Sequence, residues 1–273
     1  MNGENAIMTP TARTARFAIA LGIALSLLLP ACSRKKVEVA PDVASSDEAL
    51  FKLGEAAVKK DTEKALLYLR QVIDSFPKSF YAQRAKLLIA DAYFRKGDEG
   101  NMILAAAEYR EFINLYPYSP SAAYCQYQIG MTFFTKALKP GRDQSKTIQA
   151  LAEFKKVITA YPASDQARTA QDKIRDCEER LAEHALSIGK HYHRVKAYKA
   201  ATSRLGEIVT GYPGYSKMDA VYFYLGDSYF LWNKVDESGP YFTKLITDHP
   251  KSKFVKKAQE RLKMIEARAK VTK

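Results

Sequence analysis

Apolar and small side chains near the carboxy end of the chain recur at spacings of three and four residues. Residues at this spacing lie on one face of a helix. They are Tyr222, Leu225, Gly226 and Tyr229. A second apolar run occupies residues 241–246, and Pro250 then prevents that helix from continuing. A glycine on the shared face lets the second helix approach closely. The pattern predicts a helical hairpin of the tetratricopeptide type.

The same signature stands before four other prolines, namely Pro77, Pro117, Pro162 and Pro213. The copy before Pro213 keeps the spacing throughout, with Ala185, Ile188, Gly189, Tyr192, Ala201, Leu205 and Ile208. The copies before Pro162 and Pro117 contain insertions, and the first copy, with Gly54 and Leu69, is the most diffuse. Repetition of this kind predicts an all-α fold, an α-α superhelix (solenoid) of about five tetratricopeptide-like hairpins with a right-handed twist and a closing helix. Such a fold forms a binding surface rather than a catalytic pocket.

The distances between the prolines are unequal. The longest interval holds a polar stretch, from Gln166 to about Arg194, without glycine or proline before Gly189. We predict that this stretch is one extended helix that serves two neighbouring repeats. The cluster Lys139-Pro140-Gly141-Arg142-Asp143 predicts an exposed loop.

The amino end has the features of a targeting signal rather than of the folded body. Arg13 and Arg16 precede an apolar stretch at 17–29, which is shorter than the ~20 residues that span a bilayer. The sequence Leu29-Pro30-Ala31-Cys32 that closes this stretch is typical of a lipoprotein signal, so residues 1–31 are predicted to be a signal peptide and Cys32 to carry acyl chains. The alternative is an ordinary secretory signal that leaves Cys32 without lipid.

Four segments follow from these patterns. After the signal peptide, residues 32–46 form a lipidated tether of low apolar content. Residues 47–165 form the amino-terminal repeats, which we expect to bind substrate. Residues 166–273 form the carboxy-terminal repeats and the closing helix, which we expect to dock partners.

Charge narrows the choice of partners. The chain carries 43 Lys and Arg against 30 Asp and Glu, a formal net charge of +13, which suits nucleic acid, anionic lipid or an acidic partner. An exported chain without a nucleic-acid-binding motif is not expected to bind nucleic acid. Many of the cations lie beyond residue 250, where the simplest interpretation is a solvated face of the closing helix.

Motifs that carry chemistry are missing from the sequence. It contains no GxSxG, Walker, Rossmann or CxxC pattern, and the three histidines at 184, 191 and 193 lack the spacing of a metal site. We therefore expect no enzyme activity, no metal and no cofactor other than lipid on Cys32. Cys125 and Cys177 are expected to be buried free thiols, with a disulfide between them as the alternative.

Tyrosine is abundant, with 17 copies. Tyrosines at the repeat positions are expected to fill the core. A second group lies just after the prolines, where each ring either joins the core or faces a groove that holds an extended peptide; this group includes Tyr81, Tyr118, Tyr124 and Tyr215.

One stretch carries a family resemblance. It runs from Arg142-Asp143 through Tyr161-Pro162, Arg180-Leu181-Ala182 and Arg204 to Tyr212-Pro213. With the lipoprotein signal and the irregular repeats, it resembles the BamD family of lipoproteins, which belongs to the machinery that assembles outer-membrane β-barrels. The resemblance covers essentially all of residues 45–260.

The resemblance implies a non-enzymatic scaffold on the periplasmic face of the outer membrane. The amino-terminal repeats would receive the carboxy-terminal strand of unfolded β-barrel proteins, and the carboxy-terminal repeats would dock the Omp85-type barrel subunit beside other assembly lipoproteins. Arg204 matches a family arginine implicated in an ion pair with that subunit. The alternative is that Arg204 is only a surface residue of its helix. Ala185 replaces an acid that is usual in the family. Alternatives are another periplasmic repeat lipoprotein, such as a secretin pilotin or a cell-division scaffold, and an unrecognised cell-wall enzyme.

Overall fold

All regular structure in the part of the chain that is described is helical. The computed structural model describes residues 46–271, and within this range it contains eleven helices and no strand. In chain order they are α3 (Asp47–Ala57), α4 (Thr62–Ser75), α5 (Phe80–Lys96), α6 (Glu99–Leu115), α7 (Ala122–Phe134), α8 (Ser145–Ala160), α9 (Asp165–Arg194), α10 (Tyr198–Gly211), α11 (Met218–Leu231), α12 (Val235–Asp248) and α13 (Val255–Val271). The all-α prediction is confirmed.

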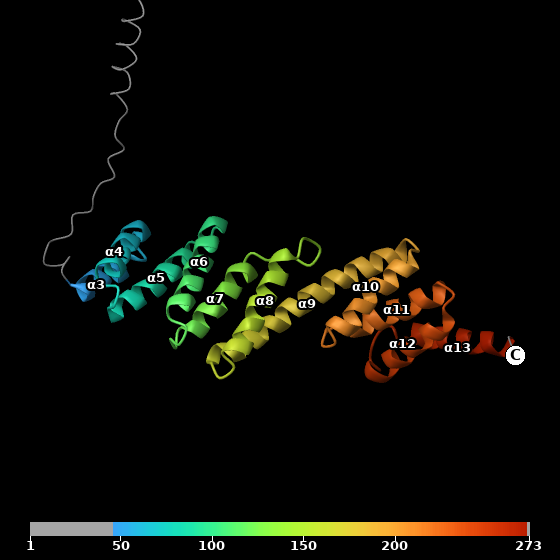
Figure 1. The fold of residues 1–273 in the computed structure, drawn as a ribbon. Helices are drawn as coiled ribbons and strands as arrows, with labels where there is room; N and C mark the ends of the chain where they lie inside the picture. The colour runs from blue at the N-terminus through green and yellow to red at the C-terminus, as the bar shows by residue number, and fades with distance from the viewer. Residues whose placement is uncertain (1–45, 272–273) are drawn as a thin grey trace, which may run out of the picture. The chain divides into compact units, whose positions relative to one another are not determined.

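Each helix packs mainly against its neighbours in the sequence. The hairpins are α3–α4, α5–α6, α7–α8, α9–α10 and α11–α12, and α13 packs against α12 and α11. Figure 1 shows the helices following one another in chain order from α3 to α13. The predicted stack of about five hairpins with a closing helix is therefore present.

The five repeat prolines set where the second helix of each hairpin ends. In every hairpin this helix stops two residues before the proline, and the residue between them is aromatic or histidine, with φ between −137° and −130°. A residue that precedes proline is excluded from the helical region by contact with the pyrrolidine ring. These non-helical residues are Phe76, Tyr116, Tyr161, Tyr212 and His249.

The closest approach within a hairpin lies at the repeat glycine. A Cβ placed on Gly130 would lie 2.6 Å from a ring atom of Phe154, and one on Gly189 would lie 2.6 Å from Leu205. The same pairing joins Gly54 to Leu69 and Gly226 to Phe242. The first repeat, diffuse in sequence, thus packs like the others.

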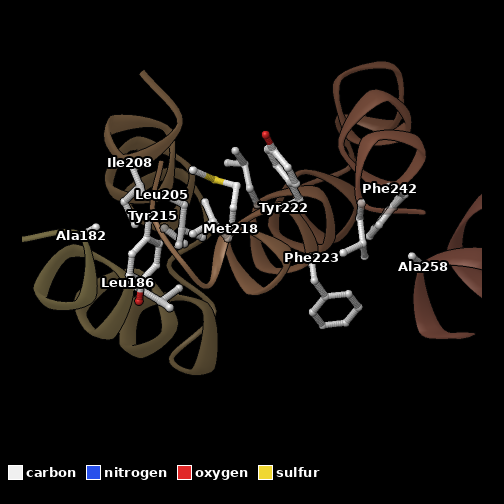
Figure 2. Packing of buried hydrophobic residues seen from close by; sticks show 14 of the residues in the cluster. Ala182, Leu186, Leu205, Ile208, Tyr215, Met218, Tyr222, Phe223, Phe242 and Ala258 are labelled. Carbon is white, nitrogen blue, oxygen red and sulfur yellow. The ribbon is translucent and has the colours of Figure 1, made fainter. Parts of the chain in front are cut away.

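The polar stretch after Pro162 forms one helix, as predicted. Helix α9 is 30 residues long, and it contacts α7 and α8 as well as α10 and α11. Near its middle, Ala182 and Leu186 enter the core cluster that continues through α10, α11 and α12 (Figure 2). One helix therefore belongs to two neighbouring hairpins.

Helix α13 closes the stack because it lacks the face that would receive another helix. In α11, Tyr222, Gly226 and Tyr229 face α12, whereas the residues at the same distance from the preceding proline in α13 are Gln259, Lys263 and Glu266. All three are exposed. A polar outer face is what terminal elements of a repeat array need, and it agrees with the expected solvated face.

The two cysteines in the described range are free and buried, as expected. Burial raises the pKa of the Cys125 thiol to about 12 and that of Cys177 to about 11, so neither is a reactive thiolate. None of the helices between residues 46 and 271 combines the length and the apolar character that a membrane span requires. Cys32, the signal peptide and nearly all of the predicted tether lie outside the described residues.

Candidate functional site

A concave surface of the carboxy-terminal repeats surrounds Arg204. This Arg204 cleft has a volume of about 630 Å³. Its two sides are formed by α8 and α10, and its floor is formed by α9. Its lining residues are Asp143, Gln144, Ser145, Ile148, Leu151, Lys155, Glu178, Leu181, His184, Ala185, Ile188, Arg204, Glu207, Gly211 and Tyr212. The cleft exists because α9 is long enough to extend beneath two hairpins.

The apolar side chains of the cleft come from α9 and α8. Leu181, Ala185 and Ile188 recur along α9 at helical spacing and point to one side. Ile148 of α8 is 57% exposed, although it is a large aliphatic residue. An exposed aliphatic side chain beside a concave surface is typical of a protein-binding site.

Arg204 is held only loosely. Its Nη1 lies 3.1 Å from Glu207 Oε2, one helical turn away, and both side chains are about half exposed, at 50% and 51%. A second pair across the cleft joins Lys155 to Glu178 at 3.5 Å. Surface pairs of this kind contribute about 0–1 kcal/mol. A carboxylate on a partner can therefore replace Glu207 at little cost and bind the guanidinium through two hydrogen bonds.

The loop between α7 and α8 forms one rim of the cleft and is fixed to the body. The backbone carbonyl of Pro140 accepts a hydrogen bond from His184 Nδ1 on α9 at 2.5 Å. The buried amide of Gln144 donates to the carbonyls of Lys139 and Arg142 at 2.9 and 3.0 Å. The predicted exposed loop is thus present, and its ends are anchored while its tip faces solvent.

Ala185 lies on the floor of the same cleft as Arg204. The resemblance to the BamD family implies an acid at this position, where this chain has alanine. The nearby Glu183 is already engaged, because it accepts hydrogen bonds from Tyr215 and from Lys217, the latter at 2.6 Å.

A second candidate site lies at the amino-terminal end of the described chain. The guanidinium carbon of Arg84 lies 4.5 Å from the ring centre of Phe51, and 5.7 and 5.8 Å from those of Phe80 and Tyr81. Phe80 is 68% exposed, while Arg84 pairs loosely with Glu55 at 3.8 Å. We call Phe51, Phe80, Tyr81 and Arg84 the Arg84 cluster. It combines apolar rings with a weakly paired cation.

Of the predicted groove tyrosines, Tyr81 belongs to this cluster and the others lie elsewhere. Tyr118 is 97% exposed in the turn before α7. The hydroxyl of Tyr124 donates to Asp91 at 2.9 Å, so this residue serves the fold at least in part. Tyr215 is 5% exposed and belongs to the carboxy-terminal core. Phe51, Phe80 and Arg84 were missed by the sequence reasoning, although Phe80 and Arg84 stand four residues apart on one helix.

The histidines are not brought together. His184 bonds the α7–α8 loop, and His193 lies 3.3 Å from Asp227 and 3.0 Å from Ser228 Oγ. No group of three or more metal-ligating side chains forms in the described part of the chain. Burial lowers the pKa of His193, against the opposing charge of Asp227.

In sequence, this chain is similar to a family of outer membrane lipoproteins. Residues 43–231 match the family YfiO, described as "Outer membrane lipoprotein", and residues 220–252 match a tetratricopeptide repeat. The "Outer membrane protein assembly factor BamD" of Rickettsia prowazekii is 28% identical over 238 residues, which cover 85% of this chain and 91% of that protein. The protein of the same name from Neisseria meningitidis serogroup B is 26% identical and covers 87% and 93%. The solved TPR2AB-domain:pHSP90-complex of yeast Sti1 covers 82% of this chain and 84% of its own, at 14% identity and a TM-score of 0.42.

Proposed function

This chain belongs to the YfiO family of outer membrane lipoproteins, and we propose that it is a non-enzymatic scaffold for the assembly of outer-membrane β-barrel proteins. The relatives that span most of its length are named outer membrane protein assembly factors. The single observation that carries the proposal is the Arg204 cleft, which combines apolar side chains of α8 and α9 with an arginine whose own ion pair is weak.

We assign the Arg204 cleft to the Omp85-type barrel subunit. An exposed aliphatic side chain, Ile148, and an exchangeable guanidinium suit a folded partner domain that offers a carboxylate next to an apolar patch. Other assembly lipoproteins are expected to join the same complex.

We assign the Arg84 cluster to the client proteins. An extended strand that ends in an aromatic residue and a free carboxylate would place its ring beside Phe80 and its carboxylate on Arg84. Tyr118, which is exposed in the turn between α6 and α7, remains a candidate for contact with the same strand. Cys32 would carry the lipid that holds the scaffold on the periplasmic face of the outer membrane.

Co-purification in mild detergent tests the docking assignment. Arg204→Glu places an acid where a partner carboxylate would bind, and we expect recovery of the Omp85-type subunit to fall about tenfold or more. Arg175→Glu is the matched control, since Arg175 also pairs with an acid three residues away on an exposed helix face but lies outside the cleft. Equal recovery with both variants contradicts the assignment. Recovery of a secretin, or hydrolysis of isolated murein by the pure protein, would favour the alternatives.

Peptide binding tests the client assignment. A peptide that ends in phenylalanine should bind the full chain, and Arg84→Gln should weaken it. The same peptide with an amidated carboxy end is the control, because it keeps the ring but removes the charge that Arg84 would bind. If amidation changes nothing, Arg84 does not receive the carboxylate.

A further inference from the structure

A second, smaller cleft lies one helix away from the Arg204 cleft. This Ile103 cleft has a volume of about 150 Å³ and is formed by α6, α7 and the first turn of α8. Its lining residues are Glu99, Met102, Ile103, Ala106, Arg110, Thr132, Phe133, Lys136 and Lys146. Met102 is only 7% exposed and belongs to the floor, whereas Ile103 is 63% exposed at the rim. The cleft is mainly apolar and has room for one aromatic or branched side chain.

The rim of the Ile103 cleft is basic. Arg110, Lys136 and Lys146 contribute three cations against the single carboxylate of Glu99. Lys146 pairs with Glu99 at 3.2 Å, but the Glu99 side chain is 67% exposed, so the pair is weak. Such a rim favours carboxylates beside whatever apolar side chain enters.

The ion pairs already present at the rim do not prevent a partner carboxylate from binding there. Glu153, which lies 3.6 Å from Arg110, also accepts from Gln126 at 2.8 Å and from Lys156 at 3.1 Å. The ammonium of Lys146 also lies 5.8 Å from the ring centre of Phe133, at the edge of the apolar floor. An incoming carboxylate can therefore bind lysine without competing with a buried ion pair.

The two clefts are neighbours across the start of a single helix. Asp143, Gln144 and Ser145 line the Arg204 cleft, and the next residue, Lys146, lines the Ile103 cleft. Packed helices are separated by about 8–10 Å, so one protein domain is wide enough to cover both. Each cleft has one exposed isoleucine in its lining, Ile148 in the Arg204 cleft and Ile103 in the Ile103 cleft.

We propose that the partner docked in the Arg204 cleft also inserts an apolar side chain, carried by an acidic loop, into the Ile103 cleft. This inference rests on the proposed function, because the occupant is the same partner. It is carried by the basic rim of the Ile103 cleft, which an acidic loop would complement, and by the adjacency of the two clefts at the first turn of α8.

Site-directed photo-crosslinking in cells separates this inference from the proposed function. A photoreactive phenylalanine analogue is placed in the full chain at Ile103, at Ile148 or at Leu115, which is 55% exposed on the same helix as Ile103 but outside the cleft. We expect the first two positions to capture the same Omp85-type subunit and Leu115 to capture none. Capture of that subunit at Ile148 but not at Ile103 overturns the inference and leaves the proposed function standing. Capture of a different protein, or of lipid, at Ile103 overturns the inference as well. Failure at both positions overturns both proposals.

A binding measurement with purified components gives a second readout. Ile103→Glu places a negative charge at the rim of the cleft, where the acidic loop of the partner would lie. It should weaken binding of the Omp85-type subunit about tenfold, or about 1.4 kcal/mol. Leu115→Glu should leave binding unchanged, with equal helical content in both variants by circular dichroism. An equal effect of the two substitutions contradicts a specific contact at the cleft.

Discussion

The α5–α6 hairpin differs from the other four at the point where all five are most tightly packed. In the others a glycine of the first helix meets a large apolar side chain of the second, as Gly130 meets Phe154. In α5–α6 the equivalent positions hold Ala90 and Tyr109, both completely buried. The repeat therefore requires a small residue opposite a large one at this position, but it does not require glycine or a purely apolar partner.

The hydroxyl of the buried tyrosine needs a hydrogen-bond partner, whereas the phenylalanine ring at this position in other hairpins needs none. The buried hydroxyl of Tyr109 donates to Asp91 at 2.6 Å, and Asp91 also accepts from Tyr124 of α7 at 2.9 Å. Burial and the nearby Asp91 carboxylate raise the pKa of Tyr124 to about 12. One carboxylate thus joins the α5–α6 hairpin to the next one. The difference teaches that the same packing position can also tie neighbouring repeats together.

Removing the Asp91 carboxylate that Tyr109 and Tyr124 share should cause the largest loss of stability. Asp91→Ala removes the carboxylate that accepts from both the buried hydroxyl of Tyr109 and the hydroxyl of Tyr124, and we expect the free energy of unfolding to fall by about 2–3 kcal/mol. Urea denaturation measures the loss. Asp172→Ala is the control, because Asp172 pairs only on an exposed helix face with Arg175, and its removal should change stability by under about 0.5 kcal/mol. Similar losses in the two variants would show that Asp91 does not tie the hairpins.

Filling a glycine position should have an intermediate effect. In Gly130→Ala the new methyl group would lie 2.6 Å from the fully buried ring of Phe154, and we expect a loss of about 2 kcal/mol. In Gly226→Ala the corresponding distance to Phe242 is 3.0 Å. There, a gain of about 1 kcal/mol in helix propensity should nearly cancel the crowding. Thermal unfolding of the two variants side by side should show a large decrease only for Gly130→Ala.

Converting the exceptional hairpin to the common pattern should have the smallest effect, and its sign is informative. Ala90→Gly places in α5 the residue that the other hairpins use, yet it should destabilise by about 1 kcal/mol, because glycine costs helix stability and nothing here needs the extra space. A stabilised Ala90→Gly variant would mean that glycine is favoured by the repeat itself rather than by the size of its partner.

The sequence was sufficient for the elements and their order. The recurring apolar face predicted the hairpins, the prolines predicted where the second helices end, and the absence of breakers predicted the single helix α9. These features depend on local backbone geometry and on periodicity, which a single sequence displays directly. The free, buried state of Cys125 and Cys177 was also the expected one.

The candidate sites were predictable only in part. Arg204 could be identified through a family resemblance, but its cleft also needs Ile148 of α8 and Ala185 of α9, which periodicity alone assigns to separate helix surfaces. The rings around Arg84 come from α3 and α5. Which side chains meet across helices depends on the angle and depth of helix packing, and small residues far away in the sequence set both.

By itself, the sequence determined that this chain is a row of helical hairpins closed by a polar helix, because helix formation and its termination at proline are local events. Only the tertiary structure decided which surfaces are hollow and charged. It placed Arg204 and Ile103 in two neighbouring clefts on either side of the first turn of α8. It also placed Tyr215 in the core and left Tyr118 in solvent, although both follow a proline. The physical reason is that burial is decided by what packs against a residue, and that partner comes from another helix.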